Sequence, residues 1–446
     1  MQIHLIAIGG AVMHNLAIAL KTKGYVVTGS DDEIFEPSLS RLKKHGILPE
    51  KKGWFPENLH TGLNAVILGM HARADNPELL RAKELKIPVY SFPEYIYEQS
   101  KNKIRVAVCG SHGKTTITSM IMHVLKSQNK EFDYLVGAQL AGFETMVQLS
   151  DAPMMIIEGD EYFASPLDKR PKFLHYKAQI TLISGIAWDH FNVFPTFENY
   201  TDQFKILMQS LSAEQLLILN SEDENIKTLL NNTEVEAKII TYNTPDYYLE
   251  DNAFHLKNND KEYVFEIFGK HNMQNMEGAR LVCNALEIDD NKFYAAMQNF
   301  KGAAKRLEII HQNADSILFR DFAHAPSKVK ATVDAVKEQY PEKTLVACLE
   351  LHTYSSLNKD FIGHYKNTMN KADIRIVYYN PHTVALKKLP ELNTEEVKRF
   401  FNDEELIVIN NSEELLTQLQ KLNKVNMNLL LMSSGNFDNL EFTILT

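Results

Sequence analysis

Short apolar runs alternate along this chain with longer segments in which apolar residues recur every three or four positions. The short runs are typical of strands buried on both faces, and the longer period is typical of amphipathic helices. The first example is a strand over residues 2–8, a helix over 12–23 and a second strand over 25–31. Such alternation predicts an α/β protein whose sheets are mostly parallel.

The same pattern extends over three regions, and at 446 residues the chain is too long for one hydrophobic core. We predict domains at 1–100, 101–300 and 301–446, each a mostly parallel sheet with helices on both faces. Polar stretches at 99–103 and 300–302 are interpreted as linkers. Further strands are predicted at 65–69, 88–91, 104–109, 154–157, 179–184, 317–321, 344–349, 375–379, 405–409 and 428–432. Helices are predicted at 115–126, 196–211 and 270–286, and a hairpin at 254–265.

Composition narrows the class of protein. Hydrophobic residues make up 44% and charged residues 23% of the chain, as in ordinary globular proteins. The formal net charge of −10 gives no electrostatic basis for binding nucleic acid. No apolar run approaches the length of a membrane span, and the N-terminus lacks a secretory pattern. Three scattered cysteines predict no disulfide framework. We expect a cytoplasmic protein acting on small molecules, without membrane insertion, and no oligomer is predicted.

Residues 104–116 contain the sharpest chemical motif. A strand ends in Gly110-Ser111-His112-Gly113, and a helix follows from Lys114-Thr115-Thr116. A glycine turn before a helix directs backbone N–H groups and the positive end of the helix dipole at one point, where phosphate binds. Lys114 is placed to reach the outer phosphates, and the Thr115 hydroxyl to ligate Mg²⁺. The usual first glycine falls on Val108, so the loop is short, and the alternative is a chance Gly-Lys-Thr in a βα turn.

Carboxylates follow the next predicted strand. Glu158, Asp160 and Glu161 come directly after residues 154–157, at the sheet edge where ligands bind in open α/β folds. Hard Mg²⁺ prefers such oxygen ligands, although a solvated acidic loop would have the same sequence. Asp189-His190 follows the next predicted strand. The pair is placed to bind a second metal ion, and the alternative is that Asp189 simply orients the His190 imidazole.

The first region has the form of a nucleotide-binding βαβ unit. Gly9 and Gly10 separate the first strand from its helix, and Asp31 ends the second strand. The glycines and helix amides are placed to hold a diphosphate, and Asp31 to meet a ribose or a base edge. The usual first glycine is Ala7 and a third glycine is missing, so a purely structural unit remains the alternative.

Several other segments carry candidate binding residues. Lys169, Arg170 and His175 lie in residues 168–176, which could hold phosphate or carboxylate groups or form a charged surface loop. A helix opens with His271, Asn272 and Asn275, which are typical either of caps or of contacts to a purine edge. In the last region, two predicted strands are followed by His324, Lys328 and His352. These side chains are interpreted either as ligand contacts at the sheet edge or, for the histidines, as residues that face the core.

Taken together, these stretches resemble the Mur ligase family. The matching pieces occur in the family's order and span all three regions. They are residues 110–116 and 158–161, Asp189-His190, His271-Asn272 with Asn275, Arg306, and residues 321–326. The resemblance implies an ATP-dependent, ADP-forming amide ligase of peptidoglycan metabolism, with a Rossmann-like N-terminal domain, a P-loop ATPase in the centre and a Rossmann-like C-terminal domain.

The resemblance also implies a mechanism. The carboxylate of UDP-N-acetylmuramate attacks the γ-phosphate of ATP, and an amine then displaces phosphate from the acyl phosphate. Lys114, Glu158 and His190 are the implied catalytic residues, and Thr115, Glu158 and His190 the implied Mg²⁺ ligands. The remaining assignments form one set. The residues implied to bind ATP are 110–116, His271, Asn272, Asn275, Arg306 and Asp321. The residues implied to bind the UDP-sugar are Gly9, Gly10, Asp31, His112, Lys169, Arg170 and His175. The residues implied to bind the peptide are His324, Lys328 and His352.

The resemblance points to two branches of the family. Residues 8–17 and 351–355 resemble enzymes that attach L-alanine, whereas residues 168–176 resemble those that reattach a salvaged tripeptide, L-Ala-γ-D-Glu-meso-diaminopimelate. We expect the tripeptide, with L-alanine ligation and a non-catalytic nucleotide-binding regulator as alternatives. Lys205 lies where several members carry a carbamylated lysine, which the branch resembled here commonly lacks. Arg320 replaces a frequent second Asp.

Overall fold

The computed structural model describes residues 1–70, 72–140, 142–251, 253–303, 306–422 and 425–440. The chain divides into two compact units. The first unit is Met1–Ile186, Asp202–Tyr242 and Gly278–Asp289, and the second unit is Ala187–Thr201, Asn243–Glu277 and Asp290–Thr446. The two boundaries between the three predicted domains therefore stay predictions. None of the described helices is both long and apolar enough to cross a membrane.

The first unit begins with a four-stranded, all-parallel sheet in the order β2-β1-β3-β4. Apolar side chains on β1 and β3 are buried on both faces, as their continuous runs predict. The strands are β1 (Gln2–Ile6), β2 (Val26–Ser30), β3 (Ala65–Leu68) and β4 (Val89–Ser91). The helices are α1 (Ala11–Thr22), α2 (Ser38–Lys44), η1 (Pro56–Asn58), α3 (Pro77–Glu84) and α4 (Phe92–Ser100).

A seven-stranded sheet in the order β11-β10-β9-β5-β8-β6-β7 completes the first unit, and all its pairs are parallel except β6 with β7. Strand β5 lies at its centre. The strands are β5 (Ile104–Cys109), β6 (Asp133–Leu135), β7 (Val147–Gln148), β8 (Met154–Glu158), β9 (Ile180–Ile183), β10 (Leu216–Asn220) and β11 (Lys238–Tyr242). The associated helices are α5 (Lys114–Ser127), η2 (Lys172–His175), α6 (Phe197–Gln209), α7 (Glu224–Asn231) and α8 (Lys270–Ala285), of which α6 and α8 continue into the second unit.

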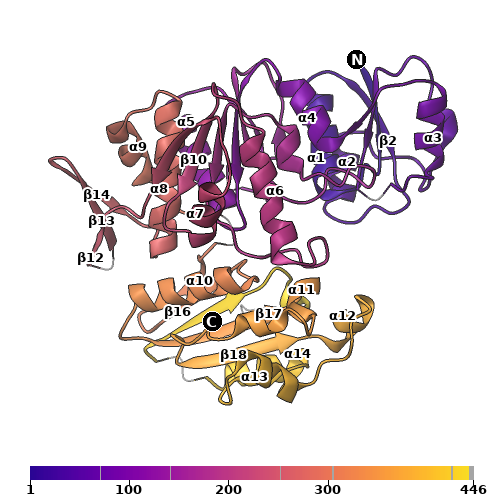
Figure 1. The fold of residues 1–446 in the computed structure, drawn as a ribbon. Coiled ribbons are helices and arrows are strands. Elements are labelled where there is room, and N and C mark those ends of the chain that lie inside the picture. Colours follow the sequence, from indigo (N-terminus) through magenta and orange to yellow (C-terminus); the bar gives the residue numbers. More distant parts are fainter. Residues whose placement is uncertain (71, 141, 252, 304–305, 423–424, 441–446) are drawn as a thin grey trace. The chain divides into compact units, whose positions relative to one another are not determined.

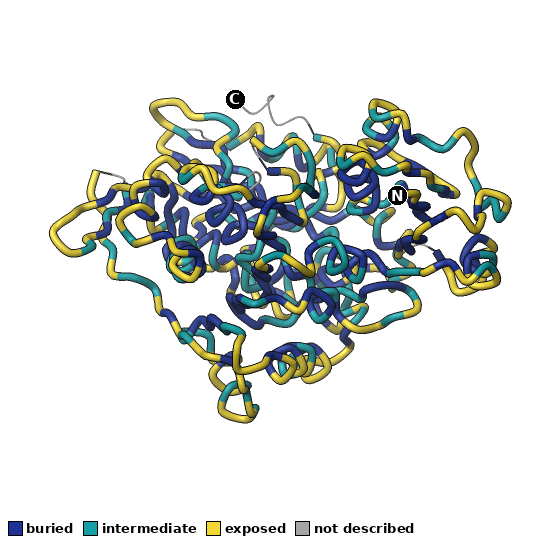
Figure 2. The backbone as a smooth tube through the Cα atoms, turned by 90° about the horizontal axis from the view of Figure 1, so that it is seen from above, coloured by how far each residue is buried: buried dark blue, intermediate teal, exposed yellow. Residues whose placement is uncertain are grey.

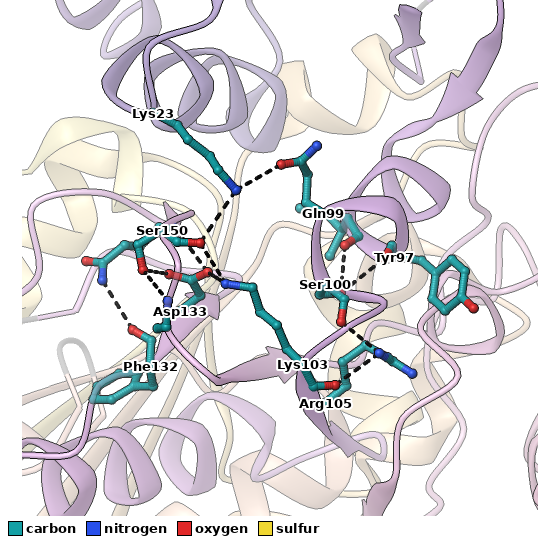
Figure 3. A network of polar contacts seen from close by, with 12 residues as sticks. Lys23, Tyr97, Gln99, Ser100, Lys103, Arg105, Phe132, Asp133 and Ser150 are labelled. Carbon is teal, nitrogen blue, oxygen red and sulfur yellow. Dashed lines mark hydrogen bonds and ion pairs between the residues drawn. The ribbon is translucent and has the colours of Figure 1, made fainter. Parts of the chain in front are cut away.

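A polar network lies at the predicted linker, residues 99–103, which connects these two sheets (Figure 3). Helix α4 extends to Ser100, so the first residues of that stretch are helical. Lys103 Nζ lies 2.5 Å from Asp133 Oδ2 and donates to Ser150 O at 2.7 Å. Lys23 Nζ, just after α1, donates to Gln99 Oε1 at 3.3 Å. Polar side chains of this linker therefore make contacts that hold a short junction.

The second unit contains two sheets. An antiparallel sheet in the order β12-β13-β14 includes the predicted hairpin, and β12 was not predicted. A six-stranded sheet in the order β15-β16-β20-β17-β18-β19 is parallel except for β15. The strands are β12 (Tyr248–Glu250), β13 (Ala253–Asn258), β14 (Lys261–Phe265), β15 (Glu308–Gln312), β16 (Ser316–Asp321), β17 (Thr344–Leu351), β18 (Ile374–Tyr379), β19 (Ile407–Ile409) and β20 (Met427–Met432).

Helices α10, α13 and α14 pack around the six-stranded sheet (Figure 1), and Leu415 and Leu419 of α14 belong to the buried cluster on one of its faces. The helices of this unit are α9 (Asp290–Met297), α10 (Pro326–Gln339), α11 (Tyr354–Leu357), η3 (Ile362–Tyr365), α12 (Pro381–Leu386), α13 (Thr394–Phe401), α14 (Ser412–Gln420) and η4 (Phe437–Asn439). Val346, Ile376 and Leu431 belong to the buried cluster on one face of this sheet. Buried residues fill the interior and exposed ones follow the outer turns (Figure 2). The predicted α/β class is confirmed.

Candidate active site

Glycine is required at three positions in and beside the loop after β5, which are Gly110, Gly113 and Gly185. Gly110 and Gly113 have φ of +123° and +78°, which is left-handed backbone that favours glycine. A Cβ on Gly110 would lie 3.0 Å from Gly185 O and would also clash with Ser184 Oγ, while a Cβ on Gly185 would overlap the His112 ring. The loop is further held because the backbone N–H of Ser111 donates to Gly185 O at 2.9 Å. Local sequence and close packing thus produce the predicted strand–loop–helix unit.

Lys114 spans this loop. Its Nζ donates to Gly110 O at 2.6 Å and lies 2.5 Å from Glu161 Oε2, and the Glu161 side chain is fully buried. Burial by itself would lower the pKa of Lys114, but the carboxylates of Glu161 and Asp160 outweigh burial and raise it. The lysine is therefore an ammonium ion at neutral pH. A positive charge fixed beside the helix N-terminus is suited to phosphate.

Thr115 and Glu158 converge as predicted. Thr115 Oγ1 donates to Glu158 Oε1 at 2.9 Å, and Gly137 N donates to the other carboxylate oxygen at 2.8 Å. A Cβ on Gly137 would lie 2.9 Å from Glu158 Oε1, so glycine at that position leaves room for the carboxylate. One hydroxyl and one carboxylate oxygen at this spacing are donors that suit Mg²⁺, and they fit the predicted metal site.

Residues 168–176 fold back on the acidic loop at 158–161. The backbone N–H of Phe173 donates to Asp160 O at 3.2 Å, and Lys172 N donates to Tyr162 O at 2.9 Å. Lys172 Nζ lies 2.5 Å from Asp160 Oδ2. Burial would raise the pKa of Asp160, but Lys172 and then Lys114 lower it below its usual value. This contact between two candidate segments has no local signal in the sequence.

The three candidate residues in this segment have different environments. Lys169 and Arg170 are exposed, and Arg170 Nη2 pairs with Asp168 Oδ2 at 2.6 Å. His175 is buried, with Nε2 3.2 Å from the same Asp168 oxygen, and burial lowers its pKa while Asp168 partly opposes that effect. Potential ligand atoms of Glu94, Asp168 and His175 lie within 4.8 Å of one another. The assignment of these residues to the UDP-sugar stays a prediction.

A cavity of about 650 Å³ lies at the carboxyl edge of the first sheet, where ligands bind in such folds. Predicted Gly9, Gly10 and Asp31 line it. The Gly9 N–H donates to Asp31 Oδ2 at 2.7 Å, so Asp31 organises the glycine turn. Burial raises the pKa of Asp31, against the lowering effect of that bond. The prediction missed other lining residues, which are Asp32, Glu33, Phe35, Trp54, Arg73, Asp75, Asn76 and Pro77.

In the second unit, Asp189 uses both carboxylate oxygens. Oδ1 accepts from the backbone N–H of His190 at 2.8 Å, and Oδ2 pairs with Lys328 Nζ at 2.9 Å. His190 has φ of +56°, a strained value that the Asp189 bond helps to hold. Burial would raise the pKa of Asp189, but Lys328 and His190 hold it well below its usual range. Lys328, predicted to contact a peptide, thus pairs with the residue beside the predicted metal ligand.

Asp321 also has both oxygens engaged. It accepts from Leu307 N at 2.7 Å and from Ala323 N at 2.6 Å, and burial raises its pKa against the opposing charge of Arg306. The Arg306 guanidinium lies 4.7 Å from the centre of the Phe322 ring. Burial beside Lys328 lowers the pKa of His324 to about 4, and its Nδ1 lies 2.8 Å from Phe322 O. A ribose role for Asp321 and a peptide role for His324 stay predictions.

The remaining candidates lie at helix and strand ends. Asn272 Nδ2 donates to Phe268 O at 2.9 Å, and Asn275 is buried. Burial lowers the pKa of His271 to about 4. His352 Nδ1 lies 3.6 Å from Glu350 Oε1 just beyond β17. Lys205 is half-buried on α6. His190, His271, Asn272, Asn275, Arg306 and Asp321 fall in the second unit, whereas the glycine loop and Glu158 fall in the first.

The chain is similar to characterised families over most of its length. A Mur ligase middle-domain model matches residues 108–283, and a model described as Mur ligase family, catalytic domain, matches residues 2–103. A UDP-N-acetylmuramate–L-alanine ligase of Persephonella marina is 30% identical over 385 residues, covering 84% of this chain and 81% of that protein. One of the same name from Sulfurihydrogenibium is 28% identical, covering 99% and 97%.

Solved structures have the same fold. A UDP-N-acetylmuramate–alanine ligase from Thermotoga maritima has a TM-score of 0.70 at 22% identity, covering 98% of this chain and 97% of its own. A murein peptide ligase from Psychrobacter arcticus has a TM-score of 0.66 at 21% identity, covering 100% and 98%. At these identities the likeness supports the fold alone.

Proposed function

Because this chain belongs to the Mur ligase family and is therefore an ATP-dependent, ADP-forming amide ligase, we propose that it joins UDP-N-acetylmuramate to a salvaged tripeptide. The tripeptide is L-Ala-γ-D-Glu-meso-diaminopimelate, and the new bond links its amine to the muramate carboxylate. This reaction returns cell-wall peptide to the nucleotide-linked pool. Since ATP is its expected co-substrate, we place the reaction in the cytoplasm.

The glycine loop supports the ATP half of the reaction. Residues 110–116 present backbone N–H groups and the N-terminus of α5, and the Lys114 ammonium lies within this loop. Phosphoryl transfer depends mainly on positioning and on neutralising charge, which these groups supply. Thr115 and Glu158 would hold Mg²⁺, which when bound would neutralise phosphate oxygens. The resemblance assigns His190 to a second ion.

The cavity in the first sheet supports binding of the nucleotide-linked sugar. It lies at the carboxyl edge of a parallel sheet and is lined by a glycine turn, by two aromatic residues, Phe35 and Trp54, and by one cation, Arg73. An aromatic face suits a base and a cation suits a diphosphate. Its volume of about 650 Å³ is in the range of ligand sites.

The observation that carries the choice of tripeptide is the packing of residues 168–176. This segment resembles the tripeptide branch, and Lys172 pairs it to Asp160 in the acidic loop that follows β8. The branch-specific residues thus lie beside the candidate metal-binding loop, where a substrate carboxylate would be activated. L-alanine is the second candidate, since residues 351–355 resemble that branch and the relatives described above are named L-alanine ligases.

One assay separates these functions. The purified protein is mixed with ATP, Mg²⁺ and UDP-N-acetylmuramate, and phosphate release is measured with tripeptide, with L-alanine and with no amine. We expect release with tripeptide, together with a product whose mass is the sum of the two substrates less one water. Release with L-alanine alone would favour the second candidate. Binding of ATP and UDP without release for either amine would instead indicate a non-catalytic regulator.

A further inference from the structure

Glu78 is a fully buried carboxylate that contacts three different elements. Ser30 Oγ, at the end of β2, donates to Glu78 Oε1 at 2.5 Å. The backbone N–H of Phe55, which precedes η1, donates to the same oxygen at 2.7 Å. His4 Nε2, on β1, lies 3.4 Å from the other oxygen. The side chains of Glu78 and His4 are both 0% exposed.

A carboxylate is costly to bury, so its partners must compensate for the loss of water. Glu78 lies in the first turn of α3, where an acid is favoured by the helix dipole. Asn76 Oδ1 accepts from the backbone N–H groups of Glu78 and Leu79 at 3.0 and 3.1 Å, which fixes the start of the helix. The carboxylate is therefore held in one position from which it can hold its neighbours.

Two of the segments that Glu78 contacts, and the helix that carries it, form part of the cavity in the first sheet. Ser30 immediately precedes Asp31, which lines the cavity and binds the glycine turn. Phe55 immediately follows Trp54, another lining residue. The helix that carries Glu78 begins with Asn76 and Pro77, which also line the cavity. One carboxylate thus connects three walls of the cavity without lining it.

We propose that Glu78 is a positioning residue for the nucleotide-sugar substrate, acting through Asp31 and Trp54. The inference rests on the proposed function, in which this cavity takes the uridine diphosphate portion of the substrate. Removing one charge-assisted bond frees either the end of β2 or the segment that carries Trp54. Binding of the UDP moiety then weakens, while the ATP loop in the other sheet is unaffected.

The test uses Glu78→Gln, which keeps the size of the side chain and the one oxygen that accepts from both Ser30 and Phe55, but removes the negative charge that strengthens both bonds. We expect the KM for UDP-N-acetylmuramate to rise about tenfold, with kcat and the KM for ATP unchanged. Glu84→Gln is the matched control, because Glu84 ends the same helix with its side chain 68% exposed. That control variant should behave as the unaltered protein.

Binding is measured separately with UDP as the probe. The chain contains two tryptophans, so Trp188→Phe leaves Trp54 as the single fluorescent indole, in the cavity wall. In that background, Glu78→Gln should raise the Kd for UDP about as much as it raises KM. The thermal unfolding midpoint is recorded alongside, because a purely structural role would lower that midpoint without a selective change in KM or Kd.

Unchanged KM and Kd in Glu78→Gln would overturn the proposal, whatever the unfolding midpoint. If that variant fails to fold, Ser30→Ala removes the bond from β2 to Glu78, together with the 3.3 Å contact between Ser30 Oγ and His4 Nε2, and should raise KM about threefold. An unchanged KM in Ser30→Ala would likewise overturn the proposal. Failure of the unaltered protein to bind UDP would refute the proposed function and the Glu78 inference together. That outcome is distinct, because it appears before any substitution is made.

Discussion

Replacing Lys114 with methionine should affect catalysis and stability by two separable routes. The ammonium group lies 2.6 Å from Gly110 O and 2.5 Å from the buried Glu161 carboxylate. Without it, phosphoryl transfer loses a fixed positive charge, and we expect phosphate release to fall by about 10²–10³-fold. Glu161 also loses its cation, and breaking a buried pair from one side costs about 3–5 kcal/mol.

The double variant Lys114→Met/Glu161→Gln separates the two effects. Glutamine removes the unpaired charge, so most of the lost stability should return, while phosphate release should stay low because the cation is still missing. A loss of about 3–5 kcal/mol in a domain of this size corresponds to a fall of about 10 °C in the unfolding midpoint. The single variant should show that fall, and the double variant should recover most of it.

The assay combines thermal unfolding with phosphate release under saturating substrates. Lys130→Met is the matched control, since Lys130 is an exposed lysine shortly after α5, and it should change neither measurement. Near-normal phosphate release in the single variant would refute the catalytic role of Lys114. A double variant no more stable than the single one would show that the charge of Glu161 is not the source of the instability.

Three further results are expected. Lys328→Met removes the partner of Asp189 Oδ2 and should lower kcat about tenfold without changing the KM for the UDP-sugar. Lys328→Arg should restore part of the rate. Steady-state kinetics would check both variants, and an unaffected kcat in Lys328→Met would contradict the prediction. Gly9→Ala places a Cβ 2.8 Å from Asp31 Oδ2, so titration calorimetry should show weaker UDP binding with ATP binding intact. His271 has its pKa lowered to about 4 by burial, so the unfolded chain takes up this proton below pH 6.5 while the folded chain does not. Stability should therefore fall between pH 6.5 and 4, less steeply in His271→Gln, and equal slopes in urea unfolding would refute the argument.

Local patterns determined much of what could be predicted. The strand over 104–109, the turn at 110–113 and the helix that follows are encoded within a few residues, because apolar runs, glycine freedom and helix capping act over short distances. The structure has the same elements with ends shifted by one or two residues. Gly9 and Gly10 were placed beside a cavity by the same local logic.

Tertiary contacts of polar side chains were not predicted. Residues 99–103 were predicted to be a linker from their polarity, and the structure adds that Ser100 ends α4 and that Lys103 pairs with Asp133. Trp54 and Arg73 were missed because a residue in an irregular loop has no periodic signal that shows which way it faces. The segment after β3 could have been suspected, since it follows the carboxyl end of a parallel strand.

The sequence by itself determined the α/β class, the glycine loop and the residue types available for phosphate and metal chemistry, because those depend on short-range rules. Only the tertiary structure decided the partners. Asp189 and Lys328 are 139 positions apart, and Ser30 and Glu78 are 48 apart. Pairs at such separations form only when several elements pack together, so no local pattern indicates them. The motifs therefore indicate which residue types are available for the reaction, and the fold determines where those side chains lie.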